Sequence, residues 1–197
     1  MQRDVVKLSP DISISSFLSI EKDIERILTK LFFDNRVESK ELLRLLVIPQ
    51  KDCLTNRTNL EYIQKVNNTS LATLVQEGYI KLAPKIAMPE HEKVKSYIII
   101  SFDNFTPNAN NPQFRDCTIH FDIICHTDYW VMNDYQLRPV KIAGYIDGIL
   151  NETKLSGIGT LNFMGMNELV LDEVLSGYTL TYRAIHGFDD HIKDTEE

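Results

Sequence analysis

The spacing of apolar residues changes partway along the chain, and this change limits the folds that the sequence can adopt. Up to about residue 84 apolar residues recur every three or four positions, whereas beyond residue 94 several segments are continuously apolar or alternate between apolar and polar residues. The first spacing places apolar side chains on one face of a helix, and the second places them on one face of a strand. The sequence therefore predicts a helical part followed by a sheet.

The N-terminal part contains four predicted helices. The clearest spans residues 17–33, and a second spans residues 38–47 and ends before Pro49. Two shorter helices are expected over residues 60–66 and 70–77. Residues 1–84 are thus predicted to form a helical N-terminal subdomain, and the Pro-containing stretch 84–92 to connect it to the remainder.

The second part has a different pattern. Its expected elements are strands over residues 94–102 and 117–126, a helix over 137–151, and strands over 157–165 and 178–186, with a turn at Ser176 and Gly177. Residues 103–115 are expected to form a long loop. This order predicts an α+β fold, in which one helix covers one face of a mostly antiparallel sheet. We assign residues 85–188 to this domain and residues 189–197 to an acidic flexible tail.

Composition and charge narrow the class of protein. Of the 197 residues, 43% are apolar and 25% are charged, as in ordinary globular proteins. Residues 1–84 carry twelve basic and eleven acidic side chains, whereas residues 85–197 carry nine and seventeen. Such an acidic half repels phosphate, which argues against a basic nucleic-acid-binding face. Three cysteines without a Cys-x-x-Cys motif indicate a reducing compartment, and we expect no signal peptide or membrane span.

One strand carries residues that could bind a metal ion. His120, Asp122 and His126 fall on the same side of strand 117–126. Neighbours at i and i+2 lie ~6.6 Å apart along a strand, but His126 would lie ~13 Å from Asp122, too far to share one ion without a bend. We therefore predict no metal, cofactor or catalytic residue. A metal-dependent hydrolase centred on His120 and Asp122 remains an alternative.

The remaining motifs do not indicate catalysis or phosphate binding, and the aromatic and methionine residues are expected in the core or in an interface. There is no Gly-x-Ser-x-Gly nucleophile motif or P-loop, and the pair Gly157 and Gly159 lacks the third glycine of a dinucleotide loop. Trp130, among several tyrosines, is expected at the edge of the core or in an interface. Met164 and Met166 are interpreted most simply as core residues.

Four segments together resemble a known protein family. SFDNFTPN, NPQFRDCTIHFDIICH, LRPVKIAGYIDGIL and GYTLTYRAIH resemble small virion proteins from the neck and tail-joining gene cluster of tailed bacteriophages and prophages. In tail-terminator proteins, the resemblance implies, an α+β subunit forms a ring, commonly a hexamer, that joins the tail tube to the head connector. Residues 1–84 are not part of that short pattern.

The resemblance implies a function without catalysis. We expect a structural subunit in the virion, present in the host cytoplasm during assembly, whose partners are the head connector or adaptor, the tail tube and copies of itself. DNA would pass through the ring without specific binding. The residues expected at subunit interfaces are Phe105, Asn108, Asn111, Arg115 and Trp130. The acids expected to repel DNA in the lumen are Asp122, Asp128, Asp134, Glu168, Asp172 and Glu173.

Two further alternatives remain open. A head-completion adaptor or assembly chaperone of the same neck region would use the N-terminal helices as its working part. A small-molecule-binding α+β module would have an apolar pocket between helix 137–151 and the sheet.

Overall fold

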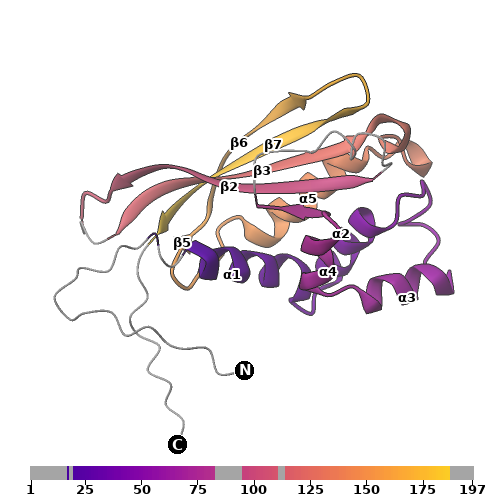
Figure 1. The fold of residues 1–197 in the computed structure, drawn as a ribbon, viewed down its shortest axis with the longest axis horizontal. Coiled ribbons are helices and arrows are strands. Elements are labelled where there is room, and N and C mark those ends of the chain that lie inside the picture. Colours follow the sequence, from indigo (N-terminus) through magenta and orange to yellow (C-terminus); the bar gives the residue numbers. More distant parts are fainter. Residues whose placement is uncertain (1–16, 18–19, 83–94, 111–113, 187–197) are drawn as a thin grey trace, which may run out of the picture.

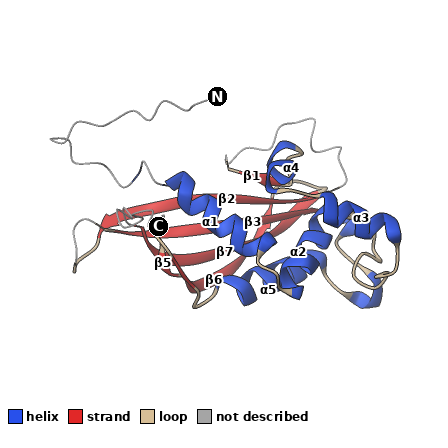
Figure 2. Ribbon diagram, turned by 90° about the horizontal axis from the view of Figure 1, so that it is seen from below, coloured by secondary structure: helices blue, strands red, loops and turns tan. Residues whose placement is uncertain are grey.

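The computed structural model describes residues 17, 20–82, 95–110 and 114–186. Within these residues, helices lie along one face of a five-stranded sheet, and the opposite face of the sheet carries no helix (Figure 1, Figure 2). The predicted α+β class is confirmed. The predicted connector at 84–92 and the acidic tail lie outside the described residues.

All five predicted helices are present, with ends shifted by a few residues. They are α1 (Ile20–Phe33), α2 (Val37–Val47), α3 (Leu60–Asn68), α4 (Leu71–Gln76) and α5 (Arg138–Leu150). The start of α3 is fixed by Asn59, whose side chain accepts hydrogen bonds from the amides of Glu61 and Tyr62. None of the helices among the described residues is long and apolar enough to cross a membrane.

The sheet has the strand order β1-β2-β3-β7-β6. Its strands are β1 (Ile80–Lys81), β2 (Ser96–Pro107), β3 (Arg115–His126), β6 (Asn162–Val170) and β7 (Leu175–His186). Of the pairs between these described strands, β1–β2 is parallel and the other three are antiparallel. A separate small hairpin pairs β4 (Lys154–Leu155) with β5 (Gly159–Thr160). The four predicted strands correspond to β2, β3, β6 and β7, whereas β1, with two residues, is too short to show a pattern.

Two loop predictions were wrong. The expected long loop 103–115 is shorter, because β2 continues to Pro107 and pairs with Arg115. A bulge between Asp103 and Thr106 breaks the alternation that would have revealed this strand. The expected turn at Ser176 and Gly177 lies inside β7. Gly177 is needed there because a Cβ atom would collide with the backbone carbonyl of Ile123.

The helices and the sheet share one hydrophobic core. Ile27 of α1, Leu46 of α2, Phe121 of β3, Ile146 of α5 and Tyr182 of β7 all belong to the same buried cluster. The N-terminal helices therefore pack on the same face of the sheet as α5. Two 3-10 turns, η3 (Thr127–Tyr129) and η4 (Asn133–Tyr135), connect β3 to α5.

Candidate assembly surface

Strand β6 presents apolar side chains at the edge of the sheet. It pairs with β7 on one side and has no second strand partner among the described residues. The exposed apolar residues of β6 and the turn after it are Phe163, Met164, Met166, Val170 and Leu171, which we call the β6 patch. Val170 is 72% exposed and Met164 is 60% exposed. An exposed apolar edge strand is a ready template for pairing with another chain.

The prediction that Met164 and Met166 belong to the core was wrong. Helix α5 packs across β3 and β7, which leaves the inward-facing side chains of β6 partly uncovered. Met164 is moreover the extra residue of a bulge between Phe163 and Gly165, so it does not follow the alternation of its strand. Sequence alternation alone cannot show how far a covering helix extends.

The exposed surface beside β6 includes one flank of α5. Asp147 of α5 accepts a hydrogen bond from the hydroxyl of Tyr182 in β7, at 2.9 Å, so this side of α5 turns toward β7. Val140 and Gly144 lie on the same side of the helix at spacings of seven and three residues, and both are exposed. The β6 patch and this flank together form a helix-and-strand surface open to a partner.

Four of the six predicted lumen acids gather at one end of the sheet. Asp128 follows the end of β3, and Asp172 and Glu173 form the turn between β6 and β7. The amide of Thr127 donates to the carbonyl of Val174 at 2.9 Å, which brings these two segments together. Glu168 lies in β6 directly opposite Tyr178, toward the same end. We call this region the acidic end.

The other two predicted acids lie elsewhere. Asp122 is on the face of the sheet opposite the helices, where its carboxylate accepts a hydrogen bond from the hydroxyl of Thr179 at 2.6 Å. Asp134 is exposed in η4, with a left-handed backbone conformation (φ 59°). The six acids therefore do not form a single surface within one subunit.

The residues considered for metal binding have other partners. Nδ1 of His120 lies 3.2 Å from the hydroxyl oxygen of Thr181, and Nδ1 of His126 accepts a hydrogen bond from the amide of Asp128 at 3.3 Å. Across the part of the chain that the structure describes, no three His, Cys, Asp or Glu side chains lie close enough to share a metal ion.

Trp130 lies at the acidic end and is half-buried. Its indole Nε1–H donates to the carbonyl of Ser176 at 3.2 Å, and its ring centroid lies 6.0 Å from that of Tyr178. These contacts fix the segment after β3 against the start of β7. The indole leaves part of its surface exposed, which fits an interface position as well as a core edge.

Three other predicted interface residues, Phe105, Asn108 and Arg115, lie at the opposite end of β3, about 36 Å away along a 12-residue strand. The Phe105 ring is half-buried, with its centroid 5.0 Å from that of Phe17. The guanidinium of Arg115 lies 4.9 Å from the centre of the Phe17 ring, and Asn108 donates to Asp116 at 3.0 Å. Asn111 lies outside the described residues. The predicted interface set thus divides between the two ends of the sheet.

Sequence reasoning missed the residue that positions this surface, Arg138. Its side chain has no exposed surface, and it donates five hydrogen bonds to backbone carbonyls. The acceptors are the carbonyl oxygens of Leu45, Ile48, Pro49, Gln50 and Tyr129, at 2.7 to 3.1 Å. One guanidinium therefore donates hydrogen bonds to carbonyl groups at and just after the C-terminal end of α2, and it also binds the segment that carries Trp130. The sequence offered only a general indication of this contact: the last carbonyls of every helix lack a partner within the helix, so a donor was to be expected near the end of α2.

A second missed contact joins α1 to the end of the sheet. Asp23 and His186 are both fully buried, and Oδ2 of Asp23 lies 2.5 Å from Nδ1 of His186. Arg26 lies 3.2 Å from the other oxygen of Asp23 and donates to the carbonyl of Ser156 at 3.0 Å. The partners of the central pair are 163 residues apart, so local patterns gave no indication of the contact.

The fold and this surface define an α+β protein with an apolar edge strand and an acidic end. The chain belongs to the YomW family, whose sequence model matches residues 39–184, from the first turn of α2 almost to the end of β7. The name of this family is phage-derived, so the match indicates a phage-related protein. A search of curated proteins finds no significant match to the chain.

Proposed function

We propose that this protein is a structural subunit of the neck of a tailed bacteriophage, a tail-terminator type of protein that works by assembly and catalyses no reaction. Copies of the chain would form a ring, hexameric by the resemblance above, between the head connector and the tail tube. The subunit would enter this ring from the host cytoplasm. The phage-derived family name supports the phage setting, and the remainder of the proposal depends on the surface of the molecule.

The observation that carries the proposal is the β6 patch. Five apolar side chains are exposed at an open sheet edge, where a monomeric protein would place charges or a covering element. At the second edge of the sheet, among the residues that the structure describes, β1 pairs with two of the twelve residues of β2. Contacts between the two different edges of neighbouring copies would be head-to-tail, and such contacts close into rings when the rotation between subunits permits.

The charge distribution fits passage of DNA through such a ring. Asp128, Glu168, Asp172 and Glu173 lie at one end of the sheet, so a ring that turns this end inward would have an acidic lumen. Like charges repel phosphate and prevent the duplex from binding the wall. In this proposal Asp122 and Asp134 contribute less, because they lie outside the acidic end.

The test has two parts. Light scattering of the purified protein over micromolar to millimolar concentrations measures its mass, and immunogold labelling of intact virions locates it. We expect a ring-sized species and label at the neck. A monomer throughout, together with label absent from the neck, would refute the proposal. Neck label around a monomeric protein would instead favour the head-completion adaptor, which assembles on its partners.

A further inference from the structure

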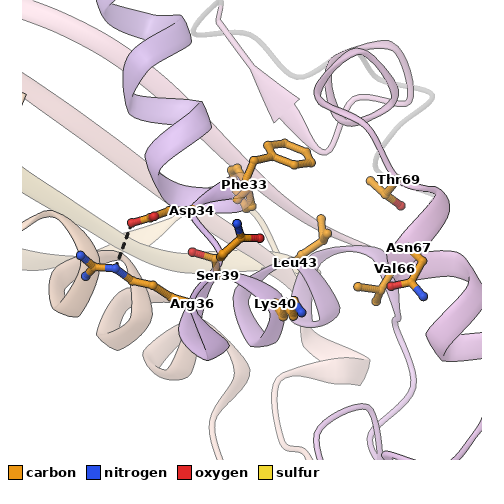
Figure 3. A pocket seen from close by; sticks show the side chains of 11 residues that line it. Phe33, Asp34, Arg36, Ser39, Lys40, Leu43, Val66, Asn67 and Thr69 are labelled. Carbon is orange, nitrogen blue, oxygen red and sulfur yellow. Dashed lines mark ion pairs between the residues drawn. The ribbon is translucent and has the colours of Figure 1, made fainter.

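A small pocket lies beside the first turns of α2, away from the β6 patch (Figure 3). It has a volume of about 170 Å³ and lies between the end of α1, the start of α2 and the end of α3. Its lining combines apolar walls, among them Phe33 and Leu43, with polar and charged residues that include Asp34, Arg36, Ser39 and Lys40. This volume suits one inserted side chain better than a drug-sized ligand.

Ser39 gives the first indication of what the pocket binds. The residue is 1% exposed and lines the pocket, yet its hydroxyl oxygen has no hydrogen-bond partner in the part of the chain that the structure describes. A buried hydroxyl without a partner destabilises the folded state, since it gives up its hydrogen bonds to water. A ligand in the pocket that accepts a hydrogen bond from Ser39 would supply the missing partner.

The start of α2 gives a second indication. Arg36 occupies the N-cap position, but its side chain makes no capping hydrogen bond. The first amide groups of a helix have no partner within the helix and carry a partial positive charge. Ser39, the third residue of α2, lines the pocket, so an anion there would lie beside this turn and interact favourably with its partial positive charge as well as with the Ser39 hydroxyl.

The charges around the pocket also favour an anion, although the protein carries a net charge of −7. Asp34 at the rim is already paired, with Lys30 at 2.6 Å and with Nε of Arg36 at 2.9 Å, and Figure 3 draws the second of these pairs. The hydrogen bond from Lys30 lowers the pKa of Asp34, so this carboxylate stays ionised and paired at neutral pH. Lys40 then contributes a positive charge to the lining.

We infer that this pocket binds the carboxylate of an acidic side chain from a partner protein. The carboxylate would accept hydrogen bonds from Ser39 and the first turn of α2, with Lys40 as its counter-charge, while the aliphatic part of the side chain packs against Phe33 and Leu43. The apolar walls favour a glutamate over an inorganic phosphate, which has no apolar part to cover them. The identification of the partner as an adjoining virion subunit rests on the proposed function, whereas the pocket itself does not.

Binding is tested with a matched pair of small probes. Amide chemical shifts of the ¹⁵N-labelled protein are followed during titration with N-acetyl-glutamate amide, its neutral glutamine analogue, or inorganic phosphate. We expect saturable shifts at Val37, Glu38 and Ser39 with the glutamate probe alone. Equal response to the glutamine probe, tighter binding of phosphate, or no response at these amides would each overturn the inference. None of these results depends on whether the protein forms a ring.

Substitutions separate binding from folding. Ser39→Ala is expected to weaken binding of the glutamate probe about tenfold, as for loss of a hydrogen bond to a charged group, while thermal stability stays the same or rises. Lys40→Gln should also weaken binding. Lys22→Gln, which removes a positive charge from the exposed far end of α1, is the matched control and should bind normally. Unchanged binding in Ser39→Ala, or equal weakening in Lys22→Gln, would contradict the inference.

Discussion

Single residues, above all Arg138, connect the parts of this protein that are distant in sequence. Its guanidinium spreads five hydrogen bonds over two segments, the end of α2 and the turn before α5. A buried charge is tolerated here because the guanidinium donates to five backbone carbonyls, including that of Leu45 in the last turn of α2. The planar, five-donor guanidinium matches this arrangement, and a lysine ammonium with three donors does not.

Replacement of Arg138 by lysine should therefore destabilise the protein strongly. We expect the free energy of unfolding to fall by about 3 kcal/mol or more, because several buried carbonyls lose their donor. Urea unfolding followed by Trp130 fluorescence measures this change. Arg57→Lys serves as a control, because this arginine is exposed. A loss below about 1 kcal/mol for Arg138→Lys would show that water replaces the missing donors.

The three cysteines should be inert in the native protein. All three are free and buried, and burial raises the pKa of Cys117 and of Cys125 to about 11 and also raises that of Cys53. Because the thiolate is the reactive form, we expect negligible reaction with Ellman's reagent at pH 8 and reaction of all three after unfolding in guanidinium. A thiol that reacts within seconds in the native state would refute this prediction.

At the level of elements, β6 differs from its neighbours in two ways. Among the described residues only one of its edges is paired with another strand, and its inward-facing side chains are less buried than those of β3 and β7. The helices cover the inward side of β2, β3 and β7, where residues such as Ile100, Phe121 and Leu180 are buried. The side chains of β6 at the corresponding positions, such as Met166, remain partly exposed. An element of this kind adds little to the core of the monomer and is available to stabilise an assembly.

Charges introduced into β6 should accordingly affect assembly more than folding. We expect Met164→Lys and Val170→Lys to change the free energy of unfolding by no more than about 0.5 kcal/mol, as is usual for exposed positions. In light scattering both variants should shift the protein from the ring-sized species toward the monomer. Val75→Lys, on the exposed side of α4, is the control. If the β6 variants assembled like the parent protein, the β6 patch would not be the interface.

At the scale of the whole molecule, the N-terminal helices and the sheet depend on the same core. Helices α1 and α2 bury Leu31 and Leu42 in the cluster that includes Ile119 of β3. Polar contacts also join the N-terminal helices to the second half of the chain. Asp23 of α1 pairs with His186 of β7, and Arg138 of α5 donates to the carbonyl of Leu45 in α2. Removal of the helices would expose the apolar face of the sheet, which has few polar side chains to interact with water.

The full chain should therefore unfold as one cooperative unit. Differential scanning calorimetry is expected to show a single transition whose calorimetric and van't Hoff enthalpies agree. Deletion of residues 1–84 should yield an aggregated or unfolded product, judged by circular dichroism and size-exclusion chromatography. Two separate transitions in the full chain, or a folded 85–197 fragment, would show that the helical part is an independent domain.

The elements follow from local sequence because their causes are local. Apolar spacing placed all five helices within a few residues, and Pro49 marked the end of α2. It also found strands β2, β3 and β7, whereas the strand predicted over 157–165 covers β5 and only the first four residues of β6. The errors arose where the pattern was interrupted, at the bulge near Asn104 and at Gly177, which meets the backbone of a neighbouring strand. A bulge or a close approach depends on the partner strand, so it leaves no periodic signal in its own segment.

Local sequence patterns were enough to predict the α+β class and the order of helices and strands, and the excess of acid in the second half is a property of the composition. They also led to the predicted roles of Trp130 and of the acids around the β6–β7 turn. Three features arise only from packing: α5 leaves β6 partly uncovered, Arg138 is buried against the end of α2, and Ser39 lines a pocket. These features depend on which distant segments meet, because burial and hydrogen-bond partners are properties of the packed chain and not of local spacing.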